Sequence, residues 1–152
     1  MRSPLLLVLI VVAIAQPSDA VKKDIQVLQG EWKVQWLEQD GKKVEVRERV
    51  CVFRGNKCEW QYIGDGAKAT EKASFEIDPT CTPKIIDYLG PLTAPKGSKR
   101  EGIYKIDGDT MIWCMNVGEG VKNRPLEFEA KSGSNRVVIW FARIKPVEKR
   151  KD

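Results

Sequence analysis

The chain has 152 residues, 42% of them hydrophobic and 31% charged, and its formal net charge is +5. This length suits one domain that buries a single core. Histidine is absent, which excludes Ser-His and Cys-His nucleophilic catalysis, and the interleaving of basic and acidic residues argues against a nucleic-acid partner.

The N-terminus predicts a secretory signal peptide. Arg2 precedes an apolar run from Leu5 to Ala15, which is too short to cross about 30 Å of hydrocarbon. Small residues at Ser18 and Ala20 predict cleavage after Ala20, and a second site lies after Ala15. We therefore expect a secreted or periplasmic protein with no integral membrane segment after cleavage, divided into a signal peptide at 1–20, a domain at 21–145 and a basic tail at 146–152.

The remaining chain predicts a β-rich domain. A short helix is expected over residues 21–29, followed by segments in which apolar and polar residues alternate. Residues 90–100, rich in Pro, Gly, Lys and Ser, predict a long rim loop. Eight or nine strands with almost no helix indicate an up-and-down barrel or a sandwich. The strands are expected at 32–37, 44–53, 58–63, 68–77 and 84–89, in a hairpin over 102–116 and in a closing hairpin of 126–131 and 136–144. Heavy charge in the first half of 44–53 predicts an exposed loop or edge there.

The hairpin over 102–116 carries the clearest local signal. Asp107 and Gly108 suit the centre of a two-residue turn, which pairs Tyr104 with Met111. That pairing places one set of side chains on a single face: Tyr104, Ile106, Met111, Trp113 and Met115.

Four cysteines in an exported chain predict disulfides. A turn at Gly55-Asn56 places Phe53 opposite Cys58 and leaves Cys51 diagonal to Cys58, so a Cys51–Cys58 bridge needs a shifted register. Cys81–Cys114 is the complementary pair, and free buried thiols remain the alternative. Without histidine or knuckle spacing, no metal site is expected.

Gly30-Glu31-Trp32 at the start of the first strand and Arg143 at the end of the last resemble the Gly-x-Trp motif and distal arginine of lipocalins. Further motifs cover nearly all of the mature chain in order: Leu28-Gln29-Gly30-x-Trp32 with Asp40-Gly41-Lys42, Phe75-x-Ile77-Asp78-Pro79, Pro83-Lys84-x-Ile86-Asp87, Gly102-Ile103-Tyr104-x-x-Asp107-Gly108-Asp109-Thr110, Cys114, and Arg124-Pro125-x-x-Phe128. With these motifs the chain resembles a bacterial lipocalin-like domain of unknown function that is abundant in planctomycetes. The resemblance implies a lipocalin-like antiparallel β-barrel of eight to nine strands with a short N-terminal helix, and it implies no activity, ligand or cofactor.

Gly30, Trp32 and Arg143 are expected to close one end of the barrel. A guanidinium lying over an indole face stabilises a protein by roughly 0.5–2 kcal/mol. This pair joins the first and last strands, so we interpret it as structural. A functional site is therefore expected at the opposite rim of the barrel.

The inward face of the barrel supplies the candidate ligand site. Aromatic and methionine side chains suit an adaptable pocket for a small apolar or amphipathic molecule, and the same residues also suit a fully packed core. The sequence favours a non-catalytic binding protein; the alternative is a protein-interaction or structural module with a packed barrel. The candidate ligand-binding residues are Trp60, Tyr62, Tyr104, Met111, Trp113 and Met115.

Other charged residues have structural interpretations. Asp78, Asp87, Asp107 and Asp109 sit at turns or strand ends, where caps and turn hydrogen bonds explain them. Arg124 is able to clamp a carboxylate or phosphate, and pairing with a local acid is the alternative.

Overall fold

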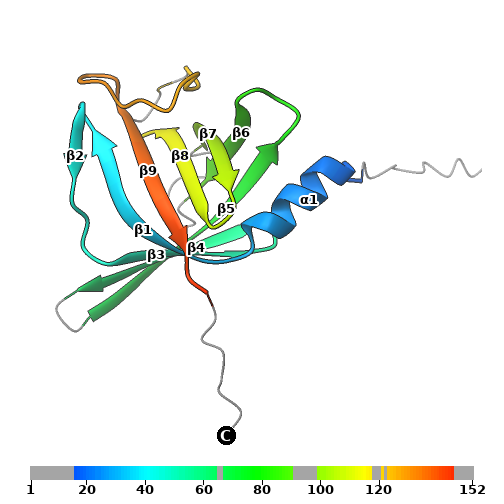
Figure 1. Cartoon of the computed structure of the whole chain (residues 1–152), viewed down its shortest axis with the longest axis horizontal. Helices are drawn as coiled ribbons and strands as arrows, with labels where there is room; N and C mark the ends of the chain where they lie inside the picture. Colours follow the sequence, from blue (N-terminus) through cyan, green and yellow to red (C-terminus); the bar gives the residue numbers. More distant parts are fainter. Residues whose placement is uncertain (1–15, 65–66, 91–98, 118–120, 122, 146–152) are drawn as a thin grey trace, which may run out of the picture.

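The computed structural model describes residues 16–64, 67–90, 99–117, 121 and 123–145. One helix lies against one end of a β-barrel (Figure 1). The predicted tail, most of the signal peptide and residues 91–98 of the predicted rim loop lie outside the described residues. The elements are α1 Asp19–Leu28, β1 Gly30–Gln39, β2 Lys42–Val44, β3 Arg49–Arg54, β4 Lys57–Gly64, β5 Ala67–Asp78, β6 Lys84–Leu89, β7 Lys99–Asp107, β8 Thr110–Asn116 and β9 Arg136–Arg143.

The sheet closes on itself through its first and last long strands. From β3 to β9 each strand pairs antiparallel with the next, β3 pairs with β1, and β1 pairs with β9 from Trp32↔Arg143 to Gln39↔Val137. Eight strands form the closed barrel, and β2 is an extra strand on β1. The predicted all-β, lipocalin-like up-and-down barrel with a short helix is confirmed.

Period-two alternation places the core inside the barrel. On β1, Trp32 and Val34 are buried while Glu31, Lys33 and Gln35 are exposed. Inward side chains from every barrel strand join one hydrophobic cluster, which the helix extends through Leu28. No helix in the described part of the chain is long and apolar enough to span a bilayer.

The strand predicted over 44–53 is two strands. β2 pairs with the end of β1 through Leu37↔Val44, and β3 pairs with its start through Lys33↔Val50. The chain that joins β2 to β3 contains more residues than the part of β1 alongside it, so residues 45–48 do not pair with β1. The exposed loop or edge expected for the charged first half of this segment is confirmed, and the break at 45–48 divides the rest into two strands.

Residues 126–131, predicted as half of a closing hairpin, form no strand. β9 pairs directly with β8 and β1, so neither β8 nor β9 has a free edge for another strand. The segment instead crosses the outside of the barrel. Ala130 is fully buried there against Ile103, Cys114 and Val138.

The β7–β8 register differs from the predicted one by two positions. Tyr104 lies opposite Trp113 and Ile106 opposite Met111, so Gly108 and Asp109 form the turn. A shift of two residues leaves every side chain on its predicted face. Tyr104, Met111, Trp113 and Met115 therefore all belong to the inner cluster, as expected.

Candidate functional site

One end of the barrel is closed by Trp32 and Arg143. The Arg143 guanidinium carbon lies 4.1 Å from the Trp32 ring centroid. Its Nη1 donates to the Gln29 carbonyl at 2.8 Å and its Nη2 to the Val27 carbonyl at 2.6 Å. Gly30 has a φ of +106°, a backbone conformation that favours glycine there. The contact expected between Trp32 and Arg143 is present and also holds the end of α1.

A second contact secures the helix at the same end. Asp24 Oδ2 accepts hydrogen bonds of 2.6 Å from both Lys84 Nζ and the Tyr104 hydroxyl. Burial and the nearby Asp24 carboxylate raise the pKa of Tyr104, so its hydroxyl remains a donor at neutral pH. Tyr104, a candidate ligand residue, therefore contacts the helix.

The middle of the barrel is filled by aromatic rings. The Trp113 centroid lies 6.1 Å from those of Trp60 and Tyr88, 6.2 Å from that of Phe53 and 6.3 Å from that of Phe141. These rings interlock as a packed core does. Of the six candidate ligand residues, five are buried and Tyr62 is half-buried.

Trp113 nevertheless has an unmet polar group. Its side chain is fully buried, and its Nε1 has no hydrogen-bond partner among the described residues. A buried indole N–H without a partner is uncommon in proteins. A Cβ on Gly102 would lie 3.1 Å from this nitrogen and 2.7 Å from the Cys114 carbonyl oxygen, so only glycine lets the indole approach β7.

The end opposite the helix carries a charged set that we call the mouth cluster: Arg49, Tyr62, Glu71, Tyr88 and Arg100. On its strand, each of these residues is an even number of positions away from a residue of the hydrophobic core. Its side chain therefore points to the inner face of the barrel. The Arg49 guanidinium carbon lies 4.7 Å from the Tyr62 centroid, and that of Arg100 lies 5.9 Å from the Tyr88 centroid. The Tyr88 hydroxyl donates to Glu71 Oε1 at 2.7 Å.

The mouth cluster is unbalanced in charge. It holds two guanidinium groups and one carboxylate, and among the described residues neither arginine forms an ion pair with Glu71. Arg49 Nε is buried without a hydrogen-bond partner there. Burial and Glu71 raise the pKa of both Tyr62 and Tyr88, so both tyrosines stay neutral. The cluster therefore carries excess positive charge at this end of the barrel, where the Tyr88 hydroxyl already donates to Glu71 and the Tyr62 hydroxyl is a further neutral group.

Sequence reasoning did not identify Arg49, Glu71 and Arg100. Arg49 lies in the charged stretch expected to be exposed and Arg100 in the predicted rim loop, whereas Glu71 shares the alternation that places Ala73 and Phe75 on one face. A charged residue in phase with an apolar strand face was the signal that would have found them.

The four cysteines are free thiols, so neither predicted disulfide is present. The β3–β4 register is the one predicted, with Phe53 opposite Cys58 and Cys51 opposite Trp60, and it leaves the two thiols diagonal. Cys81 Sγ donates to Asp78 at 3.3 Å, whereas Cys114 Sγ contacts the Glu129 carbonyl at 3.7 Å beneath the segment that crosses the outer wall.

Arg124 pairs with a local acid. Its Nη1 donates to Asp87 Oδ1 at 2.6 Å and to the Gly102 carbonyl at 2.8 Å, and Lys99 Nζ lies 2.7 Å from Asp87 Oδ2. Burial raises the pKa of Asp87, but Arg124 and Lys99 lower it more, so this pKa lies below its usual range. Of the other candidate carboxylates, Asp78 serves a turn by accepting from Thr80 N, whereas Asp109 pairs with Arg143 Nε at 3.4 Å and Lys145 Nζ at 2.9 Å.

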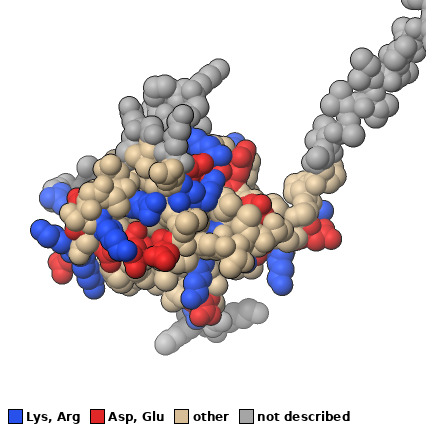
Figure 2. All heavy atoms as spheres, turned by 90° about the horizontal axis from the view of Figure 1, so that it is seen from above, with Lys and Arg blue, Asp and Glu red and all other residues tan. Residues whose placement is uncertain are grey.

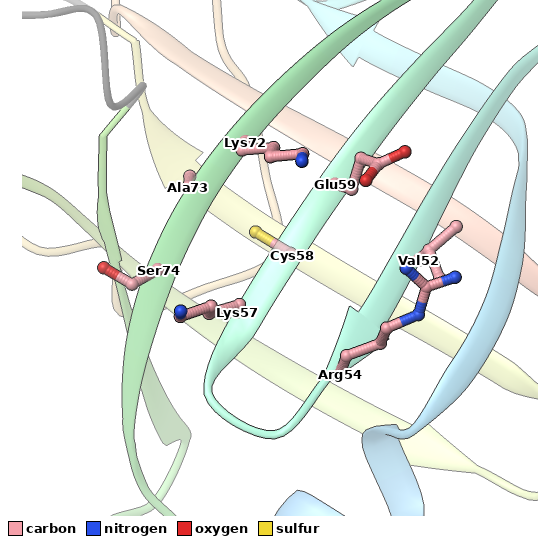
Figure 3. Close-up of a pocket in the computed structure, with 8 residues that line it drawn as sticks. All are labelled: Val52, Arg54, Lys57, Cys58, Glu59, Lys72, Ala73 and Ser74. Atoms are coloured by element: carbon pink, nitrogen blue, oxygen red, sulfur yellow. The ribbon is translucent and has the colours of Figure 1, made fainter.

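A groove of about 330 Å³ lies on the outer face of β3, β4 and β5 (Figure 3). Its charged side chains are Arg54, Lys57, Glu59 and Lys72. Elsewhere, the face of the molecule in Figure 2 carries interspersed basic and acidic side chains. Within the described residues, no group of three or more Cys, Asp or Glu side chains is arranged to hold a metal ion.

These features define a lipocalin-like β-barrel with one end closed by Trp32 and Arg143 and a charged cluster at the opposite end. No protein-family model, curated protein or solved structure matches the chain.

Proposed function

We propose that this is an exported, non-catalytic, lipocalin-like binding protein that takes a small amphipathic ligand at the end of its barrel that carries the mouth cluster. The single observation that supports this most strongly is the mouth cluster, in which Arg49 and Arg100 face inward over aromatic rings with only Glu71 to oppose their charge. The polar end of the ligand contacts the two guanidinium groups. Its apolar part lies on Tyr62 and Tyr88.

Charge and burial support an anionic polar end. A guanidinium forms paired hydrogen bonds with a carboxylate, and such charge-assisted bonds are stronger than neutral ones. The buried Arg49 Nε and Trp113 Nε1 both lack a hydrogen-bond partner among the described residues. The mouth cluster and the middle of the barrel therefore each hold a donor that a ligand can satisfy. The ring contacts around Trp113 limit the ligand to a short apolar part.

A titration with two fluorescent probes tests the proposal. We expect the anionic amphiphile 1-anilinonaphthalene-8-sulfonate to saturate at one site per chain. Replacing Arg49 and Arg100 with Met should weaken its binding about tenfold, because two charge-assisted contacts are lost. Binding of the uncharged probe Nile red should change little.

Lys105→Gln is the matched control, because Lys105 is an exposed lysine on the outer face of β7, the strand that carries Arg100. This variant should bind both probes as the unaltered protein does. If neither probe saturates the unaltered protein, the binding proposal fails.

The alternative function is a protein-interaction or structural module with a packed barrel. The ring contacts of Trp113 favour it, as does a stacked pair on the outer wall, where the Trp36 and Trp140 centroids lie 3.5 Å apart. Native mass spectrometry of protein purified from its own source separates the two. A bound small-molecule mass supports the first function, whereas an unliganded mass together with no probe saturation supports the second.

We also propose that export removes residues 1–15 rather than 1–20. α1 begins at Asp19, and the Ser18 hydroxyl accepts from Val21 N at 3.3 Å as its N-cap. Cleavage after Ala20 would remove this cap, whose loss costs about 1 kcal/mol of helix stability. N-terminal sequencing of the exported protein should begin at Gln16, and a sequence beginning at Val21 would contradict the proposal.

A further inference from the structure

The groove on the outer face of β3, β4 and β5 is built from two neighbouring rows of outward side chains. Cross-strand pairing aligns Val52 with Glu59 and Lys72 in one row, and Arg54 with Lys57 and Ser74 in the other. Figure 3 shows these side chains around the hollow. Cys58 and Ala73, between the rows, send their side chains into the core. We propose that this groove binds the phosphate group of a phosphomonoester.

The three cations of the groove outnumber its one acid, Glu59. Among the described residues, Arg54, Lys57 and Lys72 form no ion pair. Glu59, the acid in the groove, accepts a hydrogen bond of 3.0 Å from Gln61, and no ion pair joins it to Lys72 across the β4–β5 pair. The groove therefore has an excess of positive charge.

The pair formed by Arg54 and Lys57 is unfavourable by itself. The two residues lie directly opposite each other at the end of the β3–β4 hairpin. Like charges directly opposite each other destabilise a sheet. Figure 3 shows the two side chains extending away from each other, Arg54 toward Val52 and Lys57 toward Ser74. A bound anion between the two rows offsets the charge of both, which gives the pair a binding role.

The hairpin turn that carries these charges is held in place from both sides. Gln29 forms two hydrogen bonds with Gly55, with its Nε2 donating to the carbonyl at 3.1 Å and its Oε1 accepting from the amide at 2.6 Å. On the other side, Phe75 N donates to the Asn56 carbonyl at 2.9 Å. The backbone at Arg54 and Lys57 is thus fixed before a ligand arrives, which reduces the entropy that binding costs.

The groove matches a phosphate better than a carboxylate. A phosphomonoester carries nearly two negative charges and three acceptor oxygens, as a phosphorylated side chain does. Three cations supply donors from three strands, and the Ser74 hydroxyl beside them donates to the Leu89 carbonyl at 3.5 Å. Val52, only 4% exposed, forms an apolar wall, and the volume of about 330 Å³ falls at the lower end of small-molecule sites.

Amide chemical shifts in a titration with glycerol 3-phosphate test the proposal. We expect saturable shifts at Lys57, Glu59 and Ser74, with none at Arg49 or Arg100. The double variant Lys57→Gln/Lys72→Gln should weaken binding at least tenfold, whereas Lys105→Gln should leave it unchanged. Shifts that do not saturate, or that persist equally in the double variant, overturn the proposal.

Two further measurements are needed. One distinguishes a lipid headgroup from a free phosphomonoester, and the other distinguishes the groove from the mouth cluster. Sedimentation with phosphatidylcholine vesicles, with and without phosphatidic acid, identifies a lipid headgroup if only the acidic vesicles bind the protein and the double variant abolishes this. Binding of soluble glycerol 3-phosphate without vesicle binding identifies a free phosphomonoester. Because Arg49 and Arg100 lie inside the barrel, their Met variants should keep the groove intact, so failure of the mouth site and failure of the groove are separable.

Discussion

The Arg143 guanidinium lies 4.1 Å from the Trp32 ring centroid and also donates to the carbonyls of Val27 and Gln29. One side chain from the last strand thus holds the first strand and the end of the helix. Carbonyls at a helix C-terminus have no intrahelical donors, and a cation there also interacts favourably with the helix dipole. The Trp32 indole Nε1 donates to Leu28 O at 2.8 Å in the same region.

Arg143→Met should lower the free energy of unfolding by about 2–3 kcal/mol, because a cation–π contact and two charge-assisted hydrogen bonds are lost together. Urea denaturation followed by tryptophan fluorescence measures this change. The free energy of unfolding of Arg143→Lys should lie between those of Arg143→Met and the unaltered protein, since one ammonium group cannot replace both guanidinium donors. An unchanged midpoint for Arg143→Met would show that the closed end does not depend on this contact.

The same substitution at Arg49 should have the opposite effect. Arg49 Nε is buried without a partner among the described residues, and Met keeps an apolar chain beside Tyr62. Relief of the unpaired donor should exceed the lost ring contact, raising the free energy of unfolding by about 1 kcal/mol. A residue whose replacement stabilises the fold is typical of a binding site. A loss as large as that for Arg143→Met would assign Arg49 a structural role.

Acid should weaken the outer wall through Asp87. Its pKa is held below the unfolded value by Arg124 and Lys99, so its contribution to stability is present above about pH 4 and is lost as the pH falls through the folded pKa. At pH 7, Asp87→Asn should cost about 2 kcal/mol. The difference between Asp87→Asn and the unaltered protein should shrink toward pH 3 in urea titrations, whereas a constant difference would indicate a loss of packing alone.

Thiol labelling should follow burial. Cys51, Cys58 and Cys114 are buried and Cys81 is partly exposed, and burial raises the pKa of Cys114 to about 11. In the native protein, iodoacetamide should therefore label Cys81 alone. In unfolded protein kept free of reductant, mass spectrometry should find all four thiols labelled. Two unlabelled cysteines there would reveal a disulfide that the structure does not contain.

The sequence by itself determined the strands and their inward faces, which predicted a barrel or a sandwich, and the resemblance to a lipocalin-like domain implied the barrel. Alternation with period two determines which side chains face the core, and this pattern survives errors of register, as at Tyr104 and Met111. The turn residues also predicted the β3–β4 register that leaves Cys51 diagonal to Cys58, because these strands are neighbours in the chain. The contact between Trp32 and Arg143, which joins the first and last strands, was expected from the resemblance.

Only the tertiary structure decided where the charges meet. Closure of β1 on β9 occupies both edges of β8 and β9, and this forces residues 126–131 onto the outer wall. The mouth cluster draws on five strands, and the groove on three, so neither is visible as a motif. Local propensity sets the face of each residue, whereas the order and stagger of the strands determine which distant residues share that face.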